Sequence, residues 1–278
     1  MMNFNLHKTA SDHIIVVAHR GVAGGNIPCN TMVAYETAIK QGADMIEIDV
    51  DITKDGKLVI FHPGMEGSHL NLNGSIHKMT YDEVKKLRYV NSDGSYTQFG
   101  ILAFDDLLEN FKGRCYINVD KYWENPQKIY ETIKKHNMIE QCLVKSELSS
   151  NVVKLLEELS PELPFLPVVR QAHPMHKELM KKNINYVGAE VLFTNDDCEV
   201  ASYEFIDMMH KDKKLVWINS IIYDYNVQLS GGHSDDTALS ESMDKGWGWI
   251  ADRGYDIIQT DWPIMLINYL KEMGKYNK

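Results

Sequence analysis

The sequence predicts an α/β fold, a (β/α)8 (TIM) barrel with a small insertion after the second strand. Eight short β-rich runs alternate with amphipathic helical stretches, and this alternation implies parallel strands joined by right-handed crossovers. The length of 278 residues is close to the roughly 250 residues of one such barrel. We therefore expect residues 1–278 to form a single domain, with the insertion at about 63–100.

Each expected strand is a short run rich in branched and aromatic residues. These runs are 14–18, 45–51, 115–119, 142–145, 165–169, 186–191, 215–219 and 257–260, and helices are expected at 32–40, 126–136, 152–159, 174–182 and 202–211. Two segments, 63–100 and 223–240, are too long for plain connections between strand and helix. Both would follow barrel strands, which places them at the face where such barrels carry their active sites.

Composition narrows the class of partner. The net charge of −10 argues against nucleic acid and requires a metal or a local basic cluster if an anion is to bind. Four cysteines without a CxxC pair indicate neither a disulfide framework nor a zinc knuckle. The absence of a run of about 18 apolar residues predicts no integral membrane segment. The compartment stays open, cytoplasmic if the chain is complete and extracytoplasmic if a signal peptide was removed; the oligomeric state is also open.

The second expected strand concentrates negative charge on one face. Glu47, Asp49 and Asp51 occupy alternate positions, so their side chains share one side of the strand. A solvated strand face would tolerate them, but barrel strands are covered by helices outside and by packed side chains inside. Carboxylates at the carboxyl end of such a strand require a cation, and hard oxygen ligands favour Mg²⁺ or Ca²⁺. Glu47 and Asp49 are therefore candidate metal ligands, whereas Asp51 could instead cap the next turn.

Two histidines bracket these acids in the sequence. His19 ends the first expected strand and His62 ends the hairpin that follows the second. A single histidine is more often a packing residue, but two at strand ends around a carboxylate pair fit an acid–base pair. Arg20 is a candidate phosphate ligand, with a structural ion pair as the alternative.

Further polar residues follow the other strands. Asp120 and Lys121 end the third, and Trp217 on the seventh is a candidate pocket residue with a core position as the alternative. Asp261 precedes a helix that starts with proline, which is typical of an ordinary N-cap. Polar residues also end the remaining strands: Lys145, Glu147, Arg170, Glu190 and Asn219.

These motifs, in this order, resemble the glycerophosphodiester phosphodiesterase family over nearly the whole chain. The matching elements are His19-Arg20-Gly21, Pro28-Cys29-Asn30-Thr31, Glu47-Ile48-Asp49, Thr53-Lys54-Asp55-Gly56, His62-Pro63, the stretch 101–108 and the late element 254–263. The resemblance implies a barrel that carries a small insertion and a role in lipid metabolism. It also implies a Ca²⁺ or Mg²⁺ cofactor held by Glu47, Asp49 and Asp120, catalysis by His19 and His62, and contacts of Arg20 and Lys121 with the phosphate of a small-molecule phosphodiester.

The chain departs from the family pattern at several of these positions. Cys29 replaces a glutamate, and Pro63 replaces the aspartate that usually follows the histidine, so a partner that orients or tunes His62 is either missing or supplied elsewhere. The third acid is an aspartate rather than the commoner glutamate. The expected lysine stands one residue early, so Lys121 would point away from Asp120 unless the strand has ended or bulged.

The loop 231–236 is outside the family pattern and should overhang the site. His233 in this loop is a candidate substrate contact, with a solvated surface loop as the equal alternative.

The leading functional expectation is metal-dependent hydrolysis of glycerophosphodiesters to glycerol phosphate and an alcohol. One alternative is a phospholipase D-like cyclising phosphodiesterase, a fold relative that also uses two histidines and an aspartate as the third acid. The other is a catalytically impaired barrel that binds a phosphate ligand, for which the changes at Cys29 and Pro63 are the support.

Overall fold

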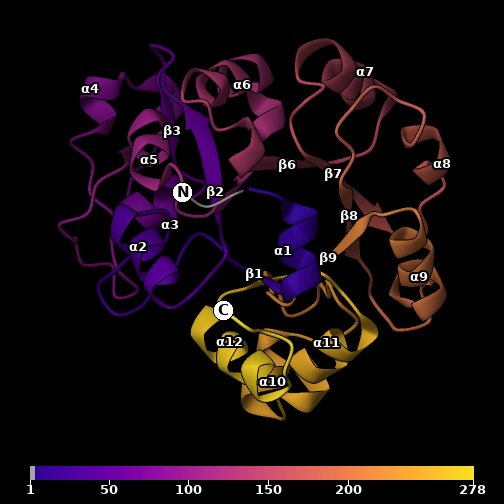
Figure 1. Ribbon diagram of the computed structural model, residues 1–278. Coiled ribbons are helices and arrows are strands. Elements are labelled where there is room, and N and C mark those ends of the chain that lie inside the picture. Colours follow the sequence, from indigo (N-terminus) through magenta and orange to yellow (C-terminus); the bar gives the residue numbers. More distant parts are fainter. Residues whose placement is uncertain (1–3) are drawn as a thin grey trace.

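Eight parallel strands close into a barrel in the computed structural model, which describes residues 4–278. Strand β1 pairs with β10 on one side and with β2 on the other, so the sheet has no free edge within the barrel. The strands end within two residues of the predicted runs, and the expected barrel is confirmed (Figure 1). Their bounds are β1 Ile15–Ala18, β2 Met45–Ile52, β5 Tyr116–Asp120, β6 Cys142–Glu147, β7 Phe165–Arg170, β8 Gly188–Leu192, β9 Leu215–Asn219 and β10 Ile257–Thr260.

Helices surround the strands and cover their outer faces (Figure 1). The predicted helix 174–182 is reduced to the single turn His176–Leu179. The outer helices are α2 Met32–Lys40, α5 Phe104–Phe111, α6 Pro126–Lys135, α7 Ser150–Leu159, α8 His176–Leu179, α9 Tyr203–Lys211, α10 Asp235–Ser240, α11 Trp249–Arg253 and α12 Pro263–Glu272.

The segment after β2 forms a small annex beside the barrel. Strand β3 (Leu58–Ile60) runs back antiparallel to β2, and β4 (Leu102–Ala103) pairs with β3. Between them lie the short helices α3 (Glu66–Leu70) and α4 (Tyr81–Val84). This annex has its own apolar cluster, made of Val59, Phe61, Leu70, Ile76, Val84, Tyr89 and Ile101.

The amino-terminal mouth of the barrel is filled by apolar side chains. Helix α1 (Leu6–Asp12) lies across this mouth (Figure 1), and Leu6 packs against residues at the start of the strands. Thr9 Oγ1 lies 3.0 Å from the hydroxyl of Tyr116. The polar residues at the opposite, carboxyl-terminal ends of the strands are thereby left as the functional candidates.

Strand β2 shows the alternation that its sequence predicts. Ile46, Ile48 and Val50 pack in the cluster beneath the outer helices. Glu47 and Asp49 are also buried, 3% and 0% exposed, but they project to the other side of the strand, into the barrel. None of the helices in the described part of the chain combines the length and apolar character that a membrane span requires.

Candidate active site

Three carboxylates meet at the carboxyl ends of neighbouring strands. In the parallel register of β2 and β5, Asp49 lies opposite Asp120, and Glu47 precedes Asp49 by two residues on the same face. One oxygen from each of these three residues lies within 4.8 Å of the others. The acids that the sequence predicted as a cluster therefore share one small space.

Such crowding is unfavourable without a positive charge. Burial and the neighbouring charge of Asp49 raise the pKa of Glu47 to about 7. Asp49 Oδ1 is buried and finds no hydrogen-bond donor among residues 4–278. A buried, unpaired carboxylate oxygen facing two further acids fits a divalent cation that prefers hard oxygen ligands.

The loop after β1 supports these acids through its backbone. The amide of Arg20 donates to Glu47 Oε2 at 2.9 Å, while Arg20 Nε lies 3.0 Å from Asp49 Oδ2. Arg20 and Gly21 both have positive φ, 53° and 79°. A β-carbon on Gly21 would lie 2.7 Å from the backbone of Ala34, so only glycine fits this turn. The His-Arg-Gly motif thus shapes the loop that grips β2.

The second motif anchors Asp49 from another side. Asn30 Nδ2 donates to Asp49 Oδ2 at 2.8 Å, and the Tyr35 hydroxyl donates to Asn30 Oδ1 at 2.6 Å. Thr31 caps α2 by accepting from the amide of Ala34. In this motif, Asn30 therefore holds a residue of the site, and Thr31 caps the helix that follows.

His19 is held by an acid from the far end of the chain. Its Nδ1 lies 2.8 Å from Asp261 Oδ1, at the end of β10. Burial alone would lower the pKa of His19, but this hydrogen bond and the charge of Glu47 raise it above its usual value. The expectation that Asp261 is a helix N-cap is wrong, because Trp262 occupies that position and the Asp261 carboxylate turns toward His19.

His62 is oriented by the backbone rather than by a carboxylate. Its Nδ1 lies 2.9 Å from the carbonyl oxygen of Pro63, and this bond fixes Nε2 as the free nitrogen. Burial lowers the pKa of His62, against the opposing charge of Asp49. The residue that replaces the family's aspartate therefore still supplies a partner, through its main chain.

Lys121 reaches Asp120 because the strand has ended. Strand β5 stops at Asp120, and Lys121 adopts a left-handed backbone conformation with φ of 60°. Its Nζ then lies 2.9 Å from Asp120 Oδ2. The charge of Lys121, followed by that of Lys145, lowers the pKa of Asp120 although burial opposes this. One turn of backbone thus brings the lysine to the site despite its early position in the sequence.

Polar side chains inside the barrel extend the site. Both side-chain polar atoms of Asn118 and the Oε1 atom of Gln259 are buried without a hydrogen-bond partner in the described chain. Lys145 Nζ lies 3.1 Å from Glu190 Oε2. All four line a cavity of about 300 Å³ together with Glu47, Asp120, Lys121 and Tyr223. Lys145 and Glu190 were visible as strand-end residues, whereas Asn118 and Gln259 carried no signal beyond their place on a strand.

Two predicted substrate contacts lie elsewhere. Trp217 has no exposed surface, because it packs inside the barrel beneath the Lys145 ammonium, which lies 4.0 Å from its ring centroid. The ring of His233 stacks on Trp249, and its two nitrogens lie 2.7 Å from the Lys245 carbonyl and 3.0 Å from Asp196. Neither side chain is free to meet a ligand in this arrangement, so the expectation of direct contact does not fit the geometry.

The same loop contributes a buried acid that sequence reasoning passed over. The Asp235 carboxylate is 2% exposed and accepts from four groups, at 2.6 to 2.8 Å. These donors are Ser220 Oγ, Trp247 Nε1, Thr260 Oγ1 and the amide of Asp261. Asp235 therefore anchors the end of β10, from which Asp261 reaches His19.

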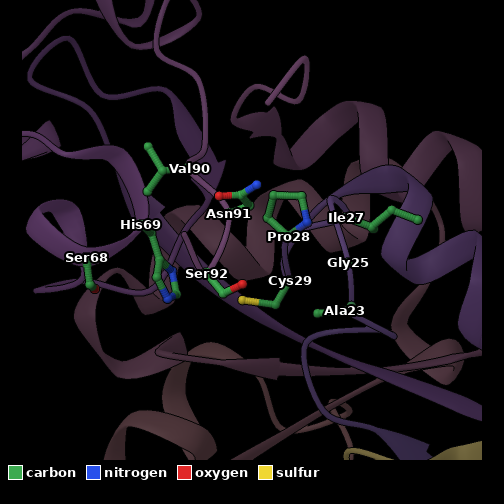
Figure 2. A pocket seen from close by; sticks show the side chains of 11 residues that line it. Ala23, Gly25, Ile27, Pro28, Cys29, Ser68, His69, Val90, Asn91 and Ser92 are labelled. Carbon is green, nitrogen blue, oxygen red and sulfur yellow. The ribbon is translucent and has the colours of Figure 1, made fainter. Parts of the chain in front are cut away.

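Two adjoining cavities lie beside His19 and the loop after β1. One, of about 510 Å³, is lined by His19, Arg20 and Asp261 and by the start of α12. The other, of about 350 Å³, lies between the loop after β1 and the annex (Figure 2). The two share Ala23, Cys29 and His69, so together they run from the histidine to the annex.

Comparison with known proteins shows the family of this chain. The sequence model of the glycerophosphoryl diester phosphodiesterase family matches residues 19–218, which include the three clustered acids and both histidines. The chain belongs to this family.

Its relatives within the glycerophosphodiester phosphodiesterases are distant. A glycerophosphodiester phosphodiesterase from Bacillus altitudinis is 29% identical over 72% of the chain and 83% of its own length. YqiK of Bacillus subtilis, an uncharacterized protein, is 32% identical over 53% of the chain, which spans only 63% of that relative. The crystal structure of a glycerophosphoryl diester phosphodiesterase from Parabacteroides distasonis shares the fold, with a TM-score of 0.78 and 20% identity over 97% of the chain and 92% of its own.

Cys29, where this phosphodiesterase departs from the family pattern, lies between the two cavities. Cys29 stands where a glutamate is usual, and burial raises the pKa of its thiol to about 11. The side chain is therefore uncharged at neutral pH, and the wall that it forms between the two cavities lacks the family's carboxylate.

Proposed function

We propose that this protein hydrolyses glycerophosphodiesters to glycerol phosphate and an alcohol, with a divalent cation and two-histidine acid–base catalysis. The observation that carries the proposal is the meeting, at one mouth of the barrel, of three carboxylates with the His19–Asp261 pair. Membership of the family supports the reaction class.

The two histidines suit different roles. His62 donates through Nδ1 to the Pro63 carbonyl, so its Nε2 lone pair can take a proton from an attacking water. His19 pairs with Asp261, which favours the protonated ring and suits it to protonate the leaving oxygen. A new bond forms between the water oxygen and phosphorus, the bond from phosphorus to the alcohol oxygen breaks, and the proton of His19 leaves with the alcohol.

A Ca²⁺ or Mg²⁺ ion would be held by Glu47, Asp49 and Asp120. When bound, it would neutralise the diester and stabilise the charge that develops on the phosphoryl oxygens. Arg20 lies beside Asp49, and Lys121 lies beside Asp120. The guanidinium and the ammonium group can therefore both approach the same phosphate. These groups offset the overall charge of −10 at the place where an anion must bind.

Phosphorus NMR of glycerophosphoethanolamine and glycerophosphocholine, with and without a chelator, tests the reaction. We expect glycerol phosphate to form, and to cease forming when the metal is removed. A persistent cyclic phosphate would show that a substrate hydroxyl, rather than water, attacks phosphorus. Diester binding without turnover in the presence of several divalent metals would indicate that the protein binds a diester but does not hydrolyse it.

Variants of the two histidines test their roles. His19→Ala and His62→Ala should each reduce kcat by about 10²-fold or more, the scale of general acid–base catalysis. His210→Ala, on the outer helix α9, is the matched control and should stay near the parent activity. Near-native activity in either of the first two variants would contradict the assignment.

A further inference from the structure

The cavity between the loop after β1 and the annex is separate from the carboxylate cluster but continuous with the space beside His19. It is lined on one side by the loop 23–29 and on the other by residues of the annex, including Ser68, His69 and Ser92. Its volume of about 350 Å³ is that of a small-ligand site. Figure 2 shows His69, Ser92 and Cys29 around the same space.

The position of this cavity fits the alcohol half of a diester. Cys29 and His69 line both this cavity and the one that contains His19 and Arg20. A diester whose leaving oxygen faces His19 can therefore extend its alcohol past Cys29 toward the annex. The separate cavity with Glu47, Asp120 and Lys121 provides the charged surroundings for the phosphate and the glycerol hydroxyls.

The lining of the annex cavity is uncharged and mostly apolar, with a few polar groups from the annex. Among the described residues that form it, none is an acid, a lysine or an arginine. Burial and the charge of Arg20 lower the pKa of His69, so this ring is neutral at pH 7. Hydroxyl, amide and imidazole groups of Ser68, Asn91 and His69 can exchange hydrogen bonds with hydroxyl groups.

A cationic alcohol would find little to hold it in this space. Quaternary ammonium groups are bound by aromatic faces or carboxylates, and the described lining contains no Phe, Tyr or Trp ring and no acid. Cys29 lies between this cavity and the next, and its uncharged thiol adds no carboxylate to the wall that they share. An acid and an indole, Asp261 and Trp262, line the neighbouring cavity instead.

We propose that this cavity binds the leaving alcohol and selects uncharged, hydroxyl-bearing alcohols such as glycerol or inositol over cationic choline or ethanolamine. This inference rests on the proposed hydrolysis of glycerophosphodiesters and adds to it the class of the second alcohol. The selection follows from a described lining without a charged side chain or a Phe, Tyr or Trp ring, and from the hydroxyl and amide groups on the annex.

The test compares kcat/KM for glycerophosphoglycerol, glycerophosphoinositol, glycerophosphocholine and glycerophosphoethanolamine under one set of conditions. We expect the two uncharged alcohols to be preferred by about 10-fold or more, the size of one favourable hydrogen bond or one unpaired charge at a part-exposed site. Equal or better turnover of the choline diester overturns this inference and leaves the hydrolase intact. Absence of turnover on all four overturns the proposed function and the alcohol assignment with it.

Charge variants in the cavity provide the second readout. Ser92→Asp adds a carboxylate to the lining, and Ser68→Asp adds one from a different segment, so that a folding defect in one leaves the other. Each should raise the ratio of choline to inositol turnover by about 10-fold. Ser95→Asp, exposed in the same turn as Ser92 but outside the lining, should leave this ratio within about twofold. An equal rise in the control, or no rise in both lining variants, contradicts the assignment.

Discussion

His19 Nδ1 lies 2.8 Å from Asp261 Oδ1, a pairing that joins the first barrel strand to the last across 242 positions of sequence. The contact exists because β1 and β10 are neighbours in the closed barrel, with Ala18 opposite Thr260. It gives the histidine a fixed ring orientation and a partner for its positive charge.

Removal of that partner should change the pH profile. Asp261→Asn should lower kcat/KM by about 10- to 100-fold, because the neutral amide no longer stabilises protonated His19. The Asp261 bond raises the pKa of His19, so without it the loss of activity on the alkaline side should move to lower pH. Profiles of kcat/KM against pH measure this, with exposed Asp236→Asn as control. An unshifted alkaline limb would mean that His19 does not act as the acid.

Glu47 should decide metal affinity. Glu47→Gln keeps the shape of the side chain but removes one of the three clustered charges. We expect the rise in Tm on addition of Ca²⁺ or Mg²⁺ to disappear and turnover to fall with it, because a divalent ion requires that charge. Differential scanning calorimetry with and without the ion provides the measurement. Exposed Glu241→Gln is the control, and an unchanged metal response in Glu47→Gln would remove Glu47 from the ligand set.

The metal-free protein should lose stability as pH rises through neutrality. Burial and Asp49 raise the pKa of Glu47 from 4.5 to about 7, so protonated Glu47 stabilises the folded state below pH 4.5 and this contribution is lost toward pH 7 and above. The shift corresponds to up to about 3 kcal/mol. Urea unfolding in a chelator between pH 5 and pH 8 should show the decline in the parent and a smaller one in Glu47→Gln. Parallel curves would show that Glu47 is already ionised at pH 5.

Lys121 should serve the diester rather than the cation. Lys121→Met retains the side-chain length but leaves Asp120 without its ammonium partner at 2.9 Å. We expect KM to rise about 10-fold, as for one lost charge-assisted contact, while metal affinity is unchanged or tighter because Asp120 is released. Titration with Ca²⁺ beside steady-state kinetics separates the two effects, and Lys154→Met on α7 is the control. Weaker metal binding in Lys121→Met would assign the lysine a structural role.

Asp235 should matter for stability as well as for the site. Asp235→Asn replaces one carboxylate oxygen with an NH2 group, which cannot accept. Its hydrogens then oppose either the indole of Trp247 or the amide of Asp261, which donate to different oxygens of the carboxylate. A buried acceptor with four donors cannot be replaced in this way without a cost of about 3 kcal/mol, which lowers Tm by several degrees. Calorimetry tests this. A variant with the parent Tm would mean that the Asp235 bonds are easily rearranged.

Local pattern determined the strands and the clustered acids. The alternation of Glu47 and Asp49 with Ile46, Ile48 and Val50 places the acids on the inner side of β2, whatever its neighbours are. The order of the motifs along the chain indicates the family and predicts its barrel. Sequence sufficed here because side-chain alternation and strand length are properties of the local chain.

The tertiary structure decided which distant side chains meet. Asp261 resembled a helix cap until barrel closure brought it beside His19, and Lys121 reached Asp120 only because the strand ended with a left-handed residue. Trp217 and His233 had the right residue types near strand ends, but one is packed inside the barrel and the other is paired within its own surroundings. Sequence by itself places a residue on a strand end, whereas its partners depend on backbone turns and packing that join segments far apart in the chain.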